Sequence, residues 1–364
     1  MSPVLNGGCV LLAAGGTGGH LQPILAVAAE AQSRGARVVV VTTPSQVGHI
    51  PSGYQVHALE LKGFTRCVAT KDHLTTLRLL AAATPRVWRI LKEVRPDVAV
   101  GGGGFASGPV VALAAVRGTP AIALEADAHL GVANRLLRPL VDRVCLSFPI
   151  VGLRPPKFVI TGRPLSTAQL AATGAEGRQA FGLRSDLPVL LAFGGSQGAR
   201  SINRACIDAF GGRELDFELV HVCGPRNHAA VRAELEAMGE RFERYHLVPY
   251  TDRLASAMAA ASLVVARAGG SVAELAALGR PAILVPYPHA TAGHQRKNAQ
   301  WMERGGAAWL VDDDALSGAV LQRLVGGLLG DDERLAAMAA ASAALGRPDA
   351  ARRVVDEIEH ILKG

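Results

Sequence analysis

The sequence predicts an α/β protein built from two Rossmann-like domains, each with a parallel, doubly wound β-sheet. Short apolar runs that suit buried strands alternate with helical patterns along most of the chain. The stretch CVLLAAGGTGGHLQ at residues 9–22 matches in kind the stretch PVLLAFGGSQGARSIN at residues 188–203. Each reads as a strand, a Gly-Gly-Ser/Thr loop and a helix start, so two nucleotide-binding halves are the simplest explanation. At 364 residues and 49% hydrophobic content, the chain is long enough for both.

The domain boundary is expected near residue 164. The segments Gly162–Leu165 and Ala172–Arg178 separate the two halves, and their glycine, proline and polar residues are typical of a linker. We therefore predict an N-terminal domain over 1–164 and a C-terminal domain over 165–348. The amphipathic pattern of Ala350–Leu362 predicts a final helix, within about 349–364, that packs back on the N-terminal domain.

Apolar runs bounded by turn residues locate the strands. The expected strands are Val10–Ala14, Arg37–Thr42, Asp97–Val100, Ala121–Leu124 and Arg143–Leu146 in the first half, and Glu218–Val222, Tyr245–Val248, Leu263–Ala266, Ala282–Val285 and Ala308–Leu310 in the second.

The loop Gly15–Gly19, followed by His20, joins the first strand to a helix and predicts an anion cradle. Glycine lets the backbone approach a diphosphate, and the unpaired N–H groups of a helix start point at it. A nicotinamide or flavin site is excluded because Leu21 occupies the third glycine position of G-x-G-x-x-G and the second strand ends without an acidic residue. No Gly-Lys-Ser/Thr follows, which excludes a Walker A loop.

Further glycine turns follow other strands. Gly101–Gly104 comes after the third expected strand, and loops at the carboxyl ends of parallel strands converge, so it and Gly15–His20 are expected to face one ligand. In the second half, Gly269–Ser271 enters a helix that carries Glu274, a carboxylate suited to the two hydroxyls of a ribose. A first-turn acid favoured by the helix dipole is the alternative interpretation of Glu274.

Composition and charge limit the class of partner. Five scattered cysteines without CxxC spacing indicate a reducing compartment and no metal cluster. Residues 1–165 contain 17 Lys and Arg against 8 Asp and Glu, so an anionic partner of the N-terminal domain is expected. Nucleic acid is disfavoured because no recognition helix, zinc finger or basic aromatic strand is present. Neither a spanning helix nor a signal peptide is visible, which predicts a cytosolic protein.

The stretch Lys62–Arg95 has the composition of a membrane-docking surface. Leu79, Leu80 and Trp88 stand among Lys and Arg residues, a combination that suits the headgroup boundary of an anionic bilayer. The alternative is an ordinary amphipathic packing helix, with Val87, Ile90, Leu91 and Val94 as its buried face.

The acidic run Asp312–Asp314 formally contains the D-x-D motif by which some glycosyltransferases hold a metal and a diphosphate. We interpret it as an acidic loop after the last strand, because the glycine loops already supply what a diphosphate needs. The sequence therefore predicts no metal site and no cofactor.

Taken together, Gly15–His20, Gly101–Pro109, Gly194–Arg200, Glu274 and the pair His294-Gln295 resemble the MurG family of GT-B glycosyltransferases. The resemblance runs from about Cys9 to the final helix. It implies two Rossmann-like domains facing across a cleft, and metal-independent, inverting transfer of GlcNAc from UDP-GlcNAc to undecaprenyl-linked lipid I, which forms lipid II. It also implies peripheral attachment to the cytoplasmic face of the cell membrane.

The same resemblance implies roles for individual residues. His20 becomes the candidate base for the acceptor hydroxyl, with Glu125 as an alternative base or an orienter of His20. Substrate contacts are implied for Thr17, Gly18, Gly19, Asp127, Asn134, Arg163, Ser166, Ser196, Gln197, Gly198, Thr251, Gly270, Ser271, Val272, Glu274, His294 and Gln295.

Two motifs depart from the family pattern. Leu124–Asp127 stands where the family usually shows His-Glu-Gln-Asn, and Gly162–Ser166 stands where it shows Gly-Asn-Pro-Val-Arg. The donor-contacting arginine is therefore missing unless Arg163 replaces it. These departures leave other hypotheses open: a GT-B glycosyltransferase with a different lipid or small-molecule acceptor, a UDP-GlcNAc epimerase of the same fold, or a catalytically silent nucleotide-binding relative.

Overall fold

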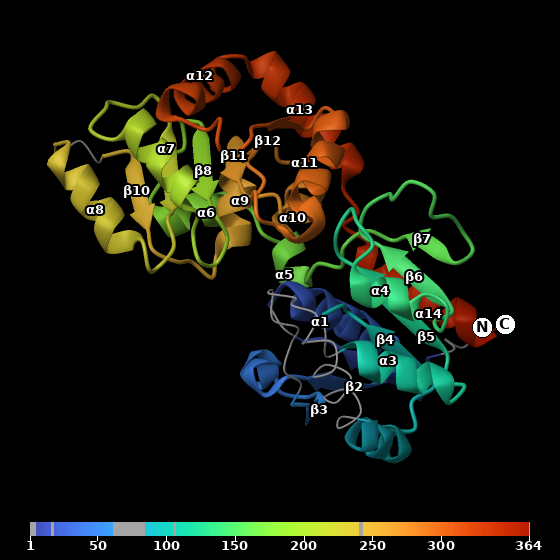
Figure 1. Ribbon diagram of the computed structural model, residues 1–364. Coiled ribbons are helices and arrows are strands. Elements are labelled where there is room, and N and C mark those ends of the chain that lie inside the picture. The colour runs from blue at the N-terminus through green and yellow to red at the C-terminus, as the bar shows by residue number, and fades with distance from the viewer. Residues whose placement is uncertain (1–4, 16–17, 61–83, 105–106, 240–242, 364) are drawn as a thin grey trace. The chain divides into compact units, whose positions relative to one another are not determined.

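The computed structural model describes residues 5–15, 18–60, 84–104, 107–239 and 243–363 (Figure 1). The chain divides into two compact units, and each contains one β-sheet. Unit 1 comprises Met1–Ser166 and Pro348–Gly364, and unit 2 comprises Thr167–Arg347. The described strands pair in parallel throughout both sheets, which confirms the predicted fold class.

The sheet of unit 1 has the strand order β3-β2-β1-β4-β5-β6-β7. The order reverses between β1 and β4, which makes this the switch point where open α/β sheets bind ligands. The two glycine segments of the N-terminal half follow these two strands. The strands are β1 (Cys9–Ala13), β2 (Arg37–Thr42), β3 (Gln55–Ala58), β4 (Val98–Gly101), β5 (Ala121–Glu125), β6 (Arg143–Leu146) and β7 (Phe158–Ile160).

Helices cover both faces of this sheet because successive strand residues point to opposite sides. Val10 and Leu12 pack under α1 and α14, while Leu11 and Ala13 pack under helical residues 84–94 and α3. Helix α4 continues this second layer over β5 and β6. The bounds are α1 (Gly18–Ser33), α3 (Ser107–Val116), α4 (Val132–Leu137) and α14 (Ala350–Lys363).

The helix over 84–94 has the predicted inward face. Val87, Ile90, Leu91 and Val94 are buried, whereas Trp88 is 40% exposed and lies under the guanidinium of Arg117, 4.6 Å from the ring centre. Leu79 and Leu80, the other residues of the predicted docking surface, lie outside the described residues.

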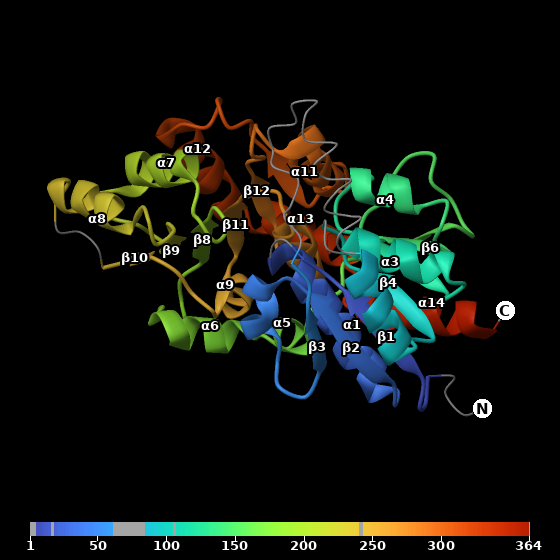
Figure 2. The same cartoon turned by 60° about the horizontal axis from the view of Figure 1, so that its bottom comes forward.

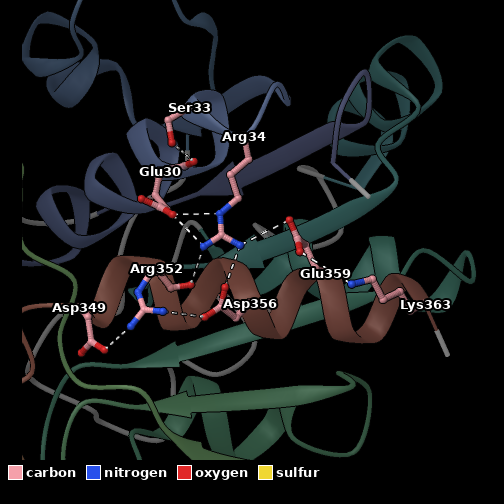
Figure 3. Close-up of polar contacts among 8 residues, drawn as sticks. All are labelled: Glu30, Ser33, Arg34, Asp349, Arg352, Asp356, Glu359 and Lys363. Atoms are coloured by element: carbon pink, nitrogen blue, oxygen red, sulfur yellow. Dashed lines mark hydrogen bonds and ion pairs between the residues drawn. The ribbon is translucent and has the colours of Figure 1, made fainter. Parts of the chain in front are cut away.

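Helix α14 returns to unit 1 and packs against α1 (Figure 3). Val354, Val355 and Ile358 are fully buried there. At the edge of this contact, Arg34 Nη1 lies 2.8 Å from Asp356 Oδ1 and 3.4 Å from Glu359 Oε1. Partly exposed ion pairs contribute about 0–1 kcal/mol each, whereas each buried aliphatic side chain contributes about 1.5–3 kcal/mol. The apolar face therefore contributes most of the free energy that holds α14 against α1.

The sheet of unit 2 has the order β10-β9-β8-β11-β12-β13, with its switch point between β8 and β11. Helices α7 and α12 lie side by side on one face (Figure 1, Figure 2). The strands are β8 (Val189–Phe193), β9 (Glu218–Val222), β10 (Tyr245–Val248), β11 (Leu263–Ala266), β12 (Ala282–Leu284) and β13 (Ala308–Leu310). The helices are α5 (Thr167–Leu170), α6 (Gly174–Phe181), α7 (Arg200–Phe210), α8 (His228–Ala237), α9 (Leu254–Ala260), α10 (Ser271–Ala277), α11 (His294–Arg304), α12 (Gly318–Leu329) and α13 (Asp332–Leu345).

The prediction that Ala172–Arg178 is a linker was wrong, because this segment opens α6. Thr173 and Glu176 form a capping box: Thr173 Oγ1 accepts from Glu176 N at 3.2 Å, and Glu176 Oε2 accepts from Thr173 N at 2.9 Å. The helix then packs tightly on α9, where a Cβ on Gly177 would lie 2.1 Å from Ser256 O.

Candidate active site

The two glycine segments of unit 1 meet at the β1/β4 switch point. A Cβ added to Gly104 would lie 2.0 Å from Gly15 O, and one added to Gly103 would lie 2.9 Å from His20 Cδ2. Both glycines have positive φ, +75° and +87° respectively, a conformation that other residues adopt at a cost. Only glycine therefore lets the second segment close over the imidazole of His20.

The surroundings of His20 favour its neutral form. The side chain is half-buried in the first turn of α1. Burial lowers the pKa of His20 below its ordinary value of 6.5, the charge of Arg163 lowers this pKa further, and the charge of Asp127 opposes both effects. A neutral imidazole at neutral pH is able to accept a proton. Gly18 begins the same helix, Gly19 is exposed, and Thr17 lies outside the described residues.

Glu125, the other predicted catalytic residue, organises the loop that follows β5. Glu125 is 5% exposed, and its carboxylate accepts hydrogen bonds from Gly131 N at 2.8 Å, Asn134 Nδ2 at 2.9 Å and Asp127 N at 3.3 Å. Burial raises the pKa of Glu125, and these hydrogen bonds oppose that rise. The Asn134 amide also donates to Leu124 O at 2.9 Å. Glu125 and Asn134 thus fix the turn that places Asp127 near His20.

Arg163 lies at the same site, after β7. Its side chain is 8% exposed, and Nη2 donates to Gly19 O at 2.5 Å. The backbone beneath it is fixed by Gly162, whose φ is +87° and whose N–H donates to Leu146 O at 3.1 Å. Ser166 is half-buried at the end of the first stretch of unit 1.

In unit 2, the glycine loop after β8 is packed against the segment after β9. A Cβ on Gly198, whose φ is +74°, would lie 1.9 Å from Cys223 O. Asn227 Nδ2 joins the two segments by donating to Gln197 O at 3.1 Å and to Cys223 O at 3.0 Å. Ser196 and Gln197 are exposed at the tip of the loop, which leaves their polar groups accessible to a ligand.

A buried network of side-chain hydrogen bonds, which was not predicted from the sequence, supports this loop. His221 is fully buried on β9, with Nε2 3.0 Å from Asn203 Oδ1 and Nδ1 2.8 Å from the Tyr245 hydroxyl. Asn203 Nδ2 in turn donates to Cys223 O at 2.9 Å. Burial lowers the pKa of His221 to about 3, so the ring is neutral and Nε2 donates to Asn203. The sequence signal for this network is a histidine in the mostly apolar strand β9 and an asparagine on the apolar face of α7.

The loops after β11 and β12 bring a second group of predicted residues together. Gly270 precedes α10, Ser271 Oγ donates to Arg267 O at 3.0 Å, and half-buried Glu274 lies one turn later. Gln295 Oε1 accepts from Tyr287 N at 2.9 Å, and its Nε2 would lie 3.9 Å from a Cβ on Gly269.

The remaining predicted residues of unit 2 lie on the same edge of the sheet or just beneath it. Val272 is a buried residue in the first turn of α10, Thr251 is half-buried in the loop after β10, and His294 is half-buried at the start of α11. Thr251 Oγ1 accepts from Arg253 N at 3.0 Å, and the ring Nδ1 of His294 lies 2.8 Å from Thr291 O.

The acidic run after β13 is engaged with arginines. Asp313 Oδ1 lies 2.5 Å from Arg267 Nη1 and accepts from Ser201 Oγ at 2.5 Å, and Asp312 pairs with Arg296. Among the described residues, no group of three or more His, Cys, Asp and Glu side chains is arranged to hold a metal ion.

Comparisons with known proteins cover nearly the whole chain. The models of the N-terminal and C-terminal domains of glycosyltransferase family 28 match residues 10–146 and 189–354. Proteins of Moorella thermoacetica and Halothermothrix orenii are 39% and 36% identical to this chain, and each alignment covers 96% of this chain and 98% of the relative. Both are named UDP-N-acetylglucosamine–N-acetylmuramyl-(pentapeptide) pyrophosphoryl-undecaprenol N-acetylglucosamine transferase. The crystal structure of Acinetobacter baumannii MurG is similar with a TM-score of 0.75 and 26% identity, over 97% of this chain and 99% of that one.

Proposed function

This chain belongs to the MurG family of glycosyltransferases, and we infer from that membership that it transfers N-acetylglucosamine from UDP-GlcNAc to lipid I to form lipid II in peptidoglycan synthesis. The observation that carries this function is the 36–39% identity over 96% of the chain. The neutral imidazole of His20, enclosed by two glycine segments at a switch point, supports it.

The direct test is a transfer assay with UDP-GlcNAc and a soluble lipid I analogue. We expect UDP and a β-linked disaccharide to form in equal amounts. Formation of UDP-ManNAc would indicate an epimerase, and release of free GlcNAc without transfer would indicate a different acceptor. Either result would contradict the assignment.

We propose that His20 is the general base. As the acceptor hydroxyl attacks the anomeric carbon of GlcNAc, His20 takes its proton, the sugar–phosphate bond breaks, and UDP leaves with the bonding electrons. Attack on the face opposite the leaving group inverts the configuration at that carbon. The lowered pKa of His20 supports this role because the imidazole is unprotonated when the acceptor binds.

We propose that unit 2 binds the donor. The loop Gly194–Gly198 and the turn Gly269–Ser271 both follow switch-point strands and lead into helices, an arrangement that suits the diphosphate. Glu274 then accepts from the ribose hydroxyls, Gln295 and His294 contact the sugar, and the backbone of Thr251 meets the uracil.

The proposed ribose contact predicts a selective loss of donor affinity. Removing a carboxylate that accepts hydrogen bonds costs about 1.5–3 kcal/mol, so Glu274→Ala should raise the KM for UDP-GlcNAc by roughly 10- to 150-fold. A donor with 2′-deoxyribose provides the sharper measurement: it should be a poorer substrate for the parent protein, and the variant should discriminate less between the two donors. Glu303→Ala, an exposed acid on α11, is the matched control. Undiminished discrimination in Glu274→Ala would contradict the ribose role.

We also propose that unit 1 docks peripherally on the cytoplasmic face of the cell membrane. The helix over 84–94, α3 and α4 form one layer, and its outer side exposes large apolar residues beside cations. Val132, Leu136 and Leu140 recur at four-residue intervals and are 60%, 70% and 45% exposed. The flanking exposed cations are Arg86, Arg89, Lys92, Arg117, Arg135 and Arg138. Exposed apolar side chains among cations suit the headgroup region of an anionic bilayer. Over the described residues, no helix combines the length and apolar character needed to span a bilayer.

The docking surface predicts salt-sensitive binding to vesicles. The double variant Trp88→Glu/Leu136→Glu should bind phosphatidylglycerol vesicles roughly tenfold or more weakly, because it loses apolar burial and adds repulsion. The double variant His49→Glu/His360→Glu, at exposed positions of unit 1 outside this surface, controls for the two added charges. Co-sedimentation at two salt concentrations measures both. Equal binding by the parent and the double variant would exclude this surface.

A further inference from the structure

Arg163 lies three residues before Ser166, which stands at the position of the family's donor-contacting arginine, and its guanidinium binds the backbone of unit 1. Arg163 is 8% exposed as a residue, and its Nη2 donates to Gly19 O at 2.5 Å. That carbonyl belongs to the residue directly before His20. Gly162 in the left-handed region and buried Pro164 and Leu165 hold the arginine on a rigid backbone. A side chain anchored in this way has little freedom to reach another ligand.

We propose that Arg163 is a positioning residue for His20: it clamps the Gly19 carbonyl and so fixes the start of α1, and it does not serve as the missing donor-binding arginine. A second restraint acts from the other side, where Gly103 and Gly104 leave no room for a side chain over the imidazole. Gly103 and Gly104 therefore restrain the ring itself, and Arg163 restrains the backbone that carries it.

The charges that face His20 come from two further elements. Arg163 approaches from the segment after β7, and Asp127 approaches from the turn after β5 that Glu125 and Asn134 hold in place. The carboxylate of Glu125 is directed at Gly131 N and Asn134 Nδ2. Arg163 lowers the pKa of His20 and Asp127 raises it, so neutralising one or the other should move this pKa in opposite directions.

The proposal rests on His20 being the general base, and the experiment keeps the two questions separate. The pKa of His20 is measured directly, by NMR titration of its ring carbon-bound proton in protein labelled at histidine, with His20→Gln to assign the signal. Kinetics are measured in parallel over the same pH range. The variants are Arg163→Met, Arg163→Lys and Asp127→Asn, with Arg154→Met, an exposed arginine before β7, as the control.

We expect Arg163→Met to raise the pKa of His20 and to lower kcat by roughly 10- to 100-fold, because displacing a reacting group by about 1 Å has this effect. The KM for UDP-GlcNAc should stay within about twofold, since no donor contact is lost. Arg163→Lys should keep the pKa low while recovering only part of kcat, because an ammonium lacks the planar fork of a guanidinium. Asp127→Asn should lower the pKa, and Arg154→Met should change neither quantity.

An unchanged His20 titration in Arg163→Met would overturn the proposal. A raised KM for the donor at constant kcat would also overturn it, and it would make Arg163 a donor contact. If Arg163→Met shifts the titration but His20→Gln remains active, the positioning role stands and the base assignment fails.

Discussion

His20→Ala is expected to lower kcat by roughly 10²- to 10⁴-fold, the contribution of a well-placed general base. The KM for UDP-GlcNAc should change little, because the proposed donor loops all lie in unit 2. Single-turnover measurements with a lipid I analogue separate the chemical step from product release. His360→Ala, at an exposed position on α14, is the matched control. Turnover within tenfold of the parent would exclude His20 as the base and move the search to the buried carboxylate of Glu125.

The same residue determines the expected pH dependence. Burial and Arg163 place the pKa of His20 below 6.5, so the active, neutral form persists as the pH falls to that value. The decline in kcat/KM on the acid side should therefore begin below pH 6.5, and it should be absent from the residual activity of His20→Ala. If kcat/KM of His20→Ala falls at low pH as it does in the parent protein, the group that titrates is not His20.

Gly104→Ala is expected to reduce kcat by about 10²-fold or more, although the substitution adds only one methyl group. The new Cβ would lie 2.0 Å from Gly15 O, which is a backbone atom. Because a backbone atom cannot rotate aside as a side chain can, one glycine segment must move away from the other. The imidazole of His20, whose Nδ1 would lie 3.5 Å from the same Cβ, moves with them. The φ of +75° adds a penalty of about 1–2 kcal/mol for any L-residue.

Gly326→Ala supplies the control, because its Cβ on α12 would meet nothing within 4 Å. It should leave kcat unchanged and raise the stability by up to about 1 kcal/mol, as expected in a helix interior. Titration with UDP would show whether Gly104→Ala keeps its donor site. Full activity of Gly104→Ala would mean that the two glycine segments can separate without disturbing His20.

The sequence located the strands of the unit 2 sheet, including its edge strands β10 and β13, but it missed the edge strands β3 and β7 of unit 1. Arg37–Thr42 and Glu218–Val222 match β2 and β9 in both bounds because continuous apolar runs mark strands buried on both faces. The strands β3 and β7 lie at the two edges of the unit 1 sheet and are mostly half-buried. The strand β3 includes the polar residues Gln55 and His57, and β7 comprises only the three residues Phe158–Ile160. An edge strand pairs on one side only and requires little apolar surface, so neither segment has the longer apolar run of β1 or β2.

Within the candidate site, residues in local motifs were predictable and residues joined by tertiary contacts were not. The convergence of Gly15–His20 with Gly101–Gly104 followed from their places after neighbouring parallel strands. The bond from Arg163 to Gly19 spans 144 residues, and the chain from Tyr245 through His221 to Asn203 joins two strands and a helix. No spacing rule connects such partners.

The return of α14 to unit 1 determines the order in which the two units can be completed as the protein leaves the ribosome. Thr167–Arg347 is one continuous stretch, so all of unit 2 is synthesised before residues 348–364 emerge. Residues 1–166 are made before unit 2, yet the surface of α1 that faces Val354, Val355 and Ile358 stays uncovered until α14 follows. The unit that carries the proposed base therefore completes its core only after unit 2 has been synthesised.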